Sequence, residues 1–357
     1  MADDRVPHSC PTVTPGLVEV VRDVVESGQH AGGAVRRAFE EDLAARVGVR
    51  HGVAVQTGSA ALHLALLALD VRPGDPVLLP TYACMAVLNA VTACGARPIL
   101  TDVSPDRLNL GTAEIETALA REELRATDLR AAIVPHMVGS PSPAHELVDA
   151  PYPVIEDCAM ALGAELADEE VGAWGVISTF SFYATKMIST GQGGMLLTDD
   201  ARIHDRATDL IQYDNRDAWH GTTWNYPLPD LAAAMGRAQL PHLESFLARR
   251  RELATHYRDF AQRHGLAHQQ HRGDATPNHY RFVLLIEDRD RIQALLAERG
   301  IDTKPPVFRP LHRYLGHPDR HFPGATQADR EALSLPIYPG LDDAALERVL
   351  AALDQIF

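Results

Sequence analysis

Short runs of consecutive apolar residues alternate with longer amphipathic segments through most of the chain. Runs of this kind are typical of strands buried on both faces, whereas a repeat of three to four residues is typical of helices. The alternation of the two predicts an α/β fold with a mostly parallel central sheet flanked by helices. The expected strands span 52–56, 75–80, 97–102, 131–137, 153–158, 177–183 and 194–198.

Helical periodicity dominates both ends of the chain. Residues 15–50 predict two helices, each ended by a glycine, and a long helical stretch begins near Asp230. A polar loop at 265–278, one strand and two helices follow. We therefore predict a large domain of residues 1–240, which includes the N-terminal helices, and a smaller α/β domain of residues 241–357.

Composition narrows the possible partners. The 357 residues carry a net charge of −15, which argues against a nucleic-acid binder and against an anionic membrane surface. The four cysteines form no CxxC pair, so neither a metal nor a disulfide framework is expected. The acidic N-terminus has no apolar segment of the kind found in signal peptides, and no apolar run is long enough to span a bilayer. These features predict a soluble cytoplasmic protein.

Two strand ends carry polar groups that suit a ligand. Gly58, Ser59 and Ala60 follow a strand and open a helix, where free backbone N–H groups favour an anion. Asp157 follows another buried strand, at the edge where open α/β sheets bind ligands. Taken singly, ordinary helix capping explains residues 58–60 better than a ligand does, and it explains Asp157 about equally well.

Lys186 lies between two apolar strands, before the glycine-rich stretch 191–194. Its apolar surroundings fit a solvated surface lysine badly, whereas a lysine in such a pocket can attack a carbonyl as the neutral amine. A phosphate cradle, a carboxylate for a ring nitrogen and an amine that forms a Schiff base are the three contacts that pyridoxal phosphate needs. We therefore predict this cofactor.

Other ligands fit the sequence less well. No GxGxxG follows a strand, and no GxxxxGK[ST] occurs. The glycine-rich stretch 191–194 precedes a strand, which is the wrong order for a dinucleotide fingerprint. The segment 317–321 has metal-like histidine spacing, but Pro318 and its polar context predict a loop.

Six segments together resemble the DegT–StrS family of pyridoxal-phosphate enzymes, whose typical members are nucleotide-sugar or cyclitol aminotransferases. The resemblance covers nearly the whole chain and implies a fold-type-I homodimer with a shared active site. The segments are TGSAALHLALLAL, LLPTYACMAVLNAV, VIEDCAMALGA, FSFYATKMISTGQGGM, WNYPLPDLAAAMGRAQL and LPIYPGL.

The resemblance also implies roles for individual residues. Lys186 is similar to the imine-forming lysine, and Asp157 to the partner of the pyridinium nitrogen. The phosphate contacts would come from Gly58, Ser59, the Ala60 N–H and Ser181. Asn225 matches an asparagine that reaches the neighbouring subunit's phosphate. Trp219 and Trp224 flank the expected cross-subunit loop, and we expect them to be interface anchors. On the substrate side, the corresponding positions are His312 and Tyr82.

Four positions depart from the family pattern. Cys84 stands where an aromatic ring often stacks on the cofactor, and Met160 where a glutamine or histidine lies near its phenolic oxygen. Gln192 replaces a glutamate, and Pro227 an arginine. These changes leave the acceptor and the reaction type open.

The predicted function is transfer of an amino group from an amino acid, with glutamate as the expected donor, to a keto sugar, a cyclitol or a related ketone. Two alternatives stay open at this level. One is a different pyridoxal-phosphate reaction, such as dehydration or elimination. The other is a non-catalytic relative on the same fold, against which the paired Asp157 and Lys186 argue.

Overall fold

A seven-stranded sheet forms the centre of the computed structural model, which describes residues 5–214, 216–218 and 221–357. The strand order is β1-β9-β8-β5-β4-β2-β3. Strand β9 runs antiparallel to both of its neighbours, and all other pairs are parallel. The strands are β1 (His51–Val55), β2 (Pro76–Pro80), β3 (Arg97–Thr101), β4 (Ala131–Pro135), β5 (Val154–Asp157), β8 (Ile177–Ser181) and β9 (Gly194–Thr198). The prediction of a mostly parallel sheet is confirmed.

Successive residues of these strands enter cores on opposite faces of the sheet. In β9, Leu196 packs in one core, whereas Met195 and Leu197 pack in the other. In β2, Leu78 likewise points away from Val77 and Leu79. Both faces are therefore covered, which explains why the strands read as continuous apolar runs rather than as alternating ones.

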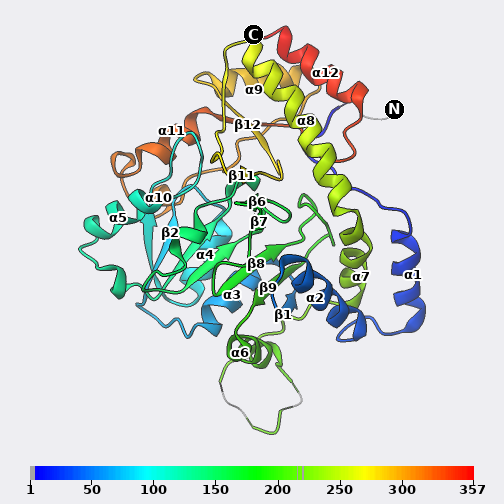
Figure 1. The fold of residues 1–357 in the computed structure, drawn as a ribbon, viewed down its shortest axis with the longest axis vertical. Coiled ribbons are helices and arrows are strands. Elements are labelled where there is room, and N and C mark those ends of the chain that lie inside the picture. The colour runs from blue at the N-terminus through cyan, green and yellow to red at the C-terminus, as the bar shows by residue number, and fades with distance from the viewer. Residues whose placement is uncertain (1–4, 215, 219–220) are drawn as a thin grey trace.

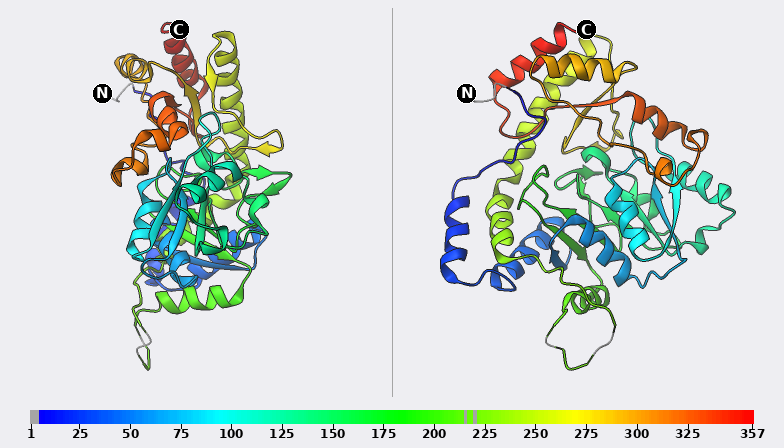
Figure 2. Two further views of the ribbon diagram at one scale, coloured as in Figure 1. Left: turned by 90° about the vertical axis from the view of Figure 1, so that its left-hand side faces the viewer. Right: turned by 180° about the vertical axis from the view of Figure 1, so that it is seen from behind.

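Helices cover the sheet on both faces (Figures 1 and 2). The two helices expected near the N-terminus form, and each ends at a glycine with positive φ, Gly28 or Gly48. The helices up to residue 239 are α1 (Leu17–Ser27), α2 (Ala34–Val47), α3 (Gly58–Ala68), α4 (Met85–Ala93), α5 (Thr112–Arg121), α6 (Ala201–Ile211) and α7 (Asp230–Gln239).

A smaller unit follows along α8, which runs beside the sheet and upward in Figure 1. Its sheet has the antiparallel order β10-β12-β13. Its elements are α8 (Leu243–Arg263), β10 (Ala267–His268), β12 (Phe282–Leu285), α9 (Arg289–Glu298), α10 (Leu311–Tyr314), α11 (Pro323–Glu331), β13 (Ala332–Leu335) and α12 (Asp343–Asp354). A third small sheet joins β11 (Ala275–Thr276), β6 (Glu165–Leu166) and β7 (Glu169–Glu170).

Contacts between the two units cross the predicted boundary at residue 240. Val6 pairs with Ile301, and the His8 ring lies 2.9 Å from the Ser334 hydroxyl, so the N-terminal segment packs on the C-terminal unit. In the other direction, Val307 and Phe322 enter the core of the large sheet. The division into residues 1–240 and 241–357 therefore stays a prediction. Among the described helices, none combines the length and the apolarity that crossing a bilayer requires.

Candidate active site

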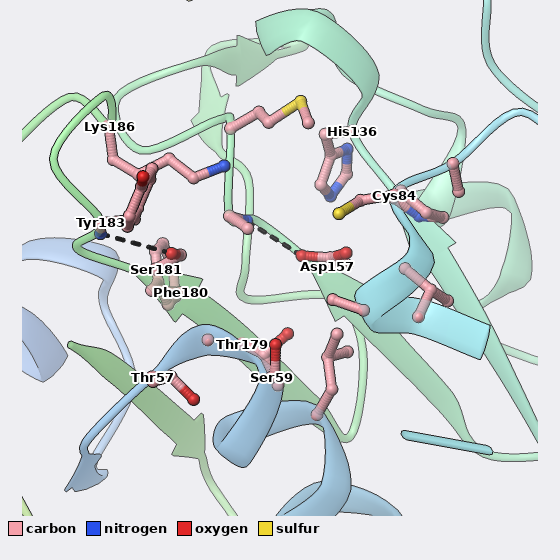
Figure 3. A pocket seen from close by; sticks show the side chains of 18 of the residues that line it. Thr57, Ser59, Cys84, His136, Asp157, Thr179, Phe180, Ser181, Tyr183 and Lys186 are labelled. Atoms are coloured by element: carbon pink, nitrogen blue, oxygen red, sulfur yellow. Dashed lines mark hydrogen bonds between the residues drawn. The ribbon is translucent and has the colours of Figure 1, made fainter. Parts of the chain in front are cut away.

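A cavity of about 410 Å³ opens at the carboxyl edge of the central sheet (Figure 3). The loops after β1, β2, β4, β5 and β8 all contribute to it, because these strands are parallel and end at the same edge. Seven of the residues expected at the site line this cavity. They are Gly58, Ser59, Cys84, Asp157, Met160, Ser181 and Lys186.

One wall of the cavity is the beginning of α3. Thr57 caps the helix, and its hydroxyl accepts the Ala60 N–H at 3.0 Å. This bond occupies the Ala60 N–H, which the family resemblance implied as a phosphate contact. The described residues offer no hydrogen-bond partner to the N–H groups of Gly58 and Ser59, which precede it. The helix start and the Ser59 and Ser181 hydroxyls therefore form a cradle suited to an anion.

Close backbone packing shapes this cradle. A methyl group on Gly194 would lie 2.4 Å from the Thr57 carbonyl oxygen and 2.6 Å from the Gly58 nitrogen. A methyl group on Gly58 would lie 2.8 Å from the Ser181 Cβ. Strand β9 and the end of β8 thus lie directly against the start of α3, which accounts for glycine at both positions.

Asp157 lies at the opposite side of the cavity. One of its carboxylate oxygens accepts the Ala159 N–H at 3.1 Å, and the described residues place no hydrogen bond on the other oxygen. Burial raises the pKa of Asp157, and the Ala159 N–H, Lys186 and His136 oppose this rise only in part. A buried, incompletely paired carboxylate suits a cationic ligand such as a protonated ring nitrogen.

Lys186 projects from the loop after β8, and its amine points into the cavity between Ser181 and Asp157 (Figure 3). Its backbone N–H donates to the Tyr183 carbonyl over 2.8 Å, which closes a turn. The amine lies 5.0 Å from the centre of the Tyr280 ring. Sequence reasoning missed Tyr280, because nothing in the pattern around residue 280 places it beside a lysine 94 positions earlier.

His136 and Glu156 support the Asp157 side of the cavity. The Glu156 side chain is fully buried and accepts hydrogen bonds from the His136 ring and from the N–H groups of Gly172, Trp174 and Gly175. Because these donors and the Ser142 N–H bonded to His136 Nδ1 occupy both groups, the pair is built as a scaffold rather than as a metal site.

Cys84 and Met160 leave the cavity without an aromatic wall or a polar donor at their positions. The Cys84 thiol is exposed to the cavity beside His136 (Figure 3). The Met160 side chain lines the cavity, and its backbone carbonyl accepts the Asn278 amide at 3.0 Å. The cavity thus retains space at Cys84, where the related pattern has an aromatic ring, whereas Met160 changes the polarity of its wall.

Two residues expected on the substrate side do not line the cavity. Tyr82 is completely buried in the core of the large sheet. The His312 side chain is also completely buried, with Nδ1 2.8 Å from the Thr81 hydroxyl and Nε2 2.8 Å from Asp319. In this chain His312 therefore ties α10 to the end of β2, and we do not retain either residue as a substrate contact.

Asn225 lies outside its own chain's cavity. Its side chain is exposed, and its backbone carbonyl accepts a hydrogen bond of 3.1 Å from the Gln56 side-chain amide. Trp224 stacks on Tyr226 and packs edge-on against His63, so it anchors this segment on its own chain. Trp219 lies outside the described residues.

Comparisons with known proteins agree with this geometry. The model of the DegT/DnrJ/EryC1/StrS aminotransferase family matches residues 13–354. GDP-perosamine synthase of Caulobacter vibrioides is 33% identical over 89% of this chain and 89% of its own. A UDP-N-acetyl-3-dehydro-alpha-D-glucosamine 3-aminotransferase of Acidithiobacillus ferrooxidans is 32% identical, covering 88% of this chain and 86% of its own. The crystal structure of DesV from S. venezuelae superposes with a TM-score of 0.88 at 31% identity, over 95% of this chain and 94% of that one. The chain therefore belongs to the DegT/DnrJ/EryC1/StrS aminotransferase family and is an aminotransferase.

Proposed function

We propose that this enzyme uses pyridoxal phosphate to transfer an amino group from an amino acid, with glutamate as the expected donor, to a keto sugar or a related cyclic ketone. One arrangement carries the proposal. The Lys186 amine and the Asp157 carboxylate face a single cavity whose far wall is the anion-binding start of α3. The names of the relatives, which act on nucleotide-linked sugars, support a sugar nucleotide as the acceptor.

The residues present fit the cofactor. The cradle of Gly58, Ser59 and Ser181 would hold its phosphate, and Asp157 its ring nitrogen. When bound, the cofactor supplies an aldehyde carbon that takes up nitrogen and a ring that accepts electrons. Asp157 keeps a negative charge opposite the ring nitrogen, and the Lys186 amine moves a proton from and to the substrate carbon.

We further propose that the enzyme works as a cytoplasmic homodimer. The exposed Asn225 side chain supports this, since it is held on a fixed backbone but lies outside its own cavity. The segment that carries it is fixed against α6 and the end of β1, where the Trp224 N–H donates to the Leu210 carbonyl and Pro227 pairs with Val55. In a dimer it would complete the partner's phosphate cradle.

The test is the donor half-reaction. The purified protein is loaded with pyridoxal phosphate and mixed with glutamate alone. We expect loss of the visible absorption of the lysine-bound cofactor and formation of an equal amount of 2-oxoglutarate. Addition of a keto sugar nucleotide should then yield the amino sugar by mass spectrometry.

Lys186→Ala should reduce the rate of this half-reaction by at least about 10³-fold, because the proton-transferring amine is removed. Lys304→Ala is the matched control, since Lys304 lies on the C-terminal unit away from the cavity. Turnover of glutamate by Lys186→Ala at the wild-type rate would refute the proposed mechanism. Elimination is tested with serine, which can lose its β-hydroxyl as water: release of pyruvate and ammonia from serine, without formation of the amine form of the cofactor, would indicate that reaction instead.

A further inference from the structure

An aromatic ring from the C-terminal half of the chain lies beside the reacting amine. Lys186 Nζ lies 5.0 Å from the centroid of the Tyr280 ring. This distance is within the range at which an ammonium group is attracted to an aromatic ring. Tyr280 is 4% exposed, so the interaction takes place largely out of water.

The Tyr280 ring is itself held in place from two sides. Its hydroxyl lies 3.0 Å from the Thr185 hydroxyl, on the residue preceding Lys186. Arg281 donates to the same hydroxyl over 3.1 Å, and its guanidinium lies 4.2 Å from the ring centroid. These contacts fix the orientation of the ring relative to the lysine loop.

The backbone around Tyr280 is bound to the loops that carry the other cavity residues. The Asn278 amide donates to the carbonyls of Met160 and Leu162 over 3.0 Å each. The backbone N–H of Asn278 donates to Gly139 over 3.1 Å, and that of Arg281 to Val138 over 3.1 Å. The position of the ring is thus coupled to the loops that follow β4 and β5, next to His136 and Asp157.

The charged groups around this ring make the Tyr280 hydroxyl easier to ionise. Burial raises the pKa of Tyr280, but Lys186, Arg281, the Thr185 hydroxyl and Arg250 outweigh it and lower the pKa to about 8. On the cavity side, Lys186 also faces Asp157. A phenol with this pKa attracts the ammonium through its ring face at neutral pH and also through its negative charge at higher pH.

We propose that Tyr280 is a positioning residue for Lys186. Its ring holds the free ammonium group at the cavity wall, between Ser181 and Asp157, during the steps in which the amine is not bonded to cofactor or substrate. This extends the proposed function, from which it takes only the identification of Lys186 as the reacting amine.

The composition of the chain allows a direct test. Lys186 and Lys304 are its only lysines. Reductive methylation of the full-length protein without added cofactor, followed by peptide mass spectrometry, reports the reactivity of Lys186 with Lys304 as an internal reference. Because only the neutral amine reacts, an ammonium group held by the ring is protected.

Removal of the ring in Tyr280→Leu should raise the Lys186:Lys304 ratio about three- to ten-fold near pH 7.5, a size expected for a cation–π contact. The gain should shrink as the pH rises toward 10, since more of the amine is then neutral in both proteins. Tyr280→Phe keeps the ring and should stay within about two-fold of the wild type below pH 8. Above pH 8 the Phe variant should become more reactive than the wild type, whose phenol is then ionised.

Two outcomes would overturn the proposal. One is an unchanged ratio in Tyr280→Leu. The other is a rise of equal size at every pH, which would mean only that the lysine has become more exposed. Tyr280→Met, which has a long side chain without a ring, repeats the comparison, and a cooperative urea transition like that of the wild type confirms that each variant is folded.

The result is independent of the proposed reaction. The labelling needs no cofactor, so an unprotected Lys186 would exclude the role of Tyr280 and leave the aminotransferase mechanism intact. An active Lys186→Ala enzyme would refute the proposed mechanism and leave the contact between Tyr280 and Lys186 intact.

Discussion

His136 donates its Nε2–H to Glu156 over 3.1 Å while the Ser142 N–H donates to its Nδ1 over 2.9 Å. Because Nδ1 accepts a hydrogen bond, the proton of the ring lies on Nε2, and the ring is held in one orientation beside the cavity. Glu156 in turn accepts backbone N–H groups from the loop before β8. This pair joins the loop after β4 and the loop before β8 to the end of β5, where Asp157 lies.

Glu156→Gln should lower the free energy of unfolding by about 2–4 kcal/mol, because an amide NH₂ group would face backbone donors in a buried site. Urea titration at pH 7 measures this loss. Glu347→Gln, at an exposed carboxylate, is the control and should change stability by less than about 0.5 kcal/mol. A Glu156→Gln protein as stable as the wild type would contradict the scaffold role.

The pKa of the Glu156 carboxylate predicts how the stability of the fold changes in acid. Burial by itself raises the pKa of Glu156, but the His136 bond and the N–H groups of Gly175 and Gly172 outweigh it and lower the pKa below 4.5. Its contribution to stability is therefore complete above pH 4.5 and is lost as the pH falls through the lowered pKa. The urea concentrations at which the wild type and Glu156→Gln are half unfolded should differ at pH 6 and become equal as the pH is lowered toward 3.

Asp157→Asn should separate stability from catalysis. Burial raises the pKa of this carboxylate above its ordinary value of 3.8. Its charged form therefore lowers the stability of the folded protein at neutral pH. The cofactor-free variant should therefore be as stable as the wild type or more stable. Its donor half-reaction should slow by at least about 10²-fold, since the charge opposite the ring nitrogen is lost. Thermal unfolding and stopped-flow absorbance test the two parts, and an unimpaired half-reaction would count against Asp157 as the ring partner.

Gly58→Ala should weaken cofactor binding about ten-fold or more. The added methyl group would lie 2.8 Å from the Ser181 Cβ, so the cradle must widen to accept it. Gly273→Ala is the matched control, because no atom lies within 4 Å of its added methyl group and its φ is not positive. Fluorescence titration with pyridoxal phosphate gives both dissociation constants, and equal values for the two variants would rule out a tight cradle.

Cys84 should be alkylated by iodoacetamide in the cofactor-free protein and protected by saturating pyridoxal phosphate. The thiol is exposed and lines the cavity, whereas the exposed Cys10 is far along the chain and does not. Cys10 should therefore react at the same rate with or without the cofactor. Peptide mass spectrometry measures both rates, and equal labelling of Cys84 in the two states would place the cofactor elsewhere.

Mixed dimers should reveal a shared site. Inactive Lys186→Ala chains mixed with weakly active Asn225→Ala chains should recover about a quarter of the wild-type activity, because half of the random dimers contain one intact site. Subunit exchange followed by the glutamate half-reaction measures this recovery. No recovery, despite exchange shown by native mass spectrometry, would mean that Asn225 does not act across the interface.

The sequence alone determined the central sheet and the main features of the site. Because the central strands are buried on both faces, they appear in the sequence as continuous apolar runs, and these runs identified all seven strands. Strands that run parallel must also end at the same edge of the sheet. Residues at the ends of β1, β5 and β8 were therefore predicted to meet, and Ser59, Asp157 and Lys186 do line one cavity. The family motifs then indicated which of these groups carry chemistry.

Only the tertiary structure decided contacts between segments far apart in the chain. Tyr280 reaches Lys186, and Val6 pairs with Ile301, because separate elements pack together. His312 likewise turned out to lie in a buried network rather than in the cavity. Local pattern sets which face of an element is apolar, but the packing of distant elements sets the direction and the partners of each polar side chain.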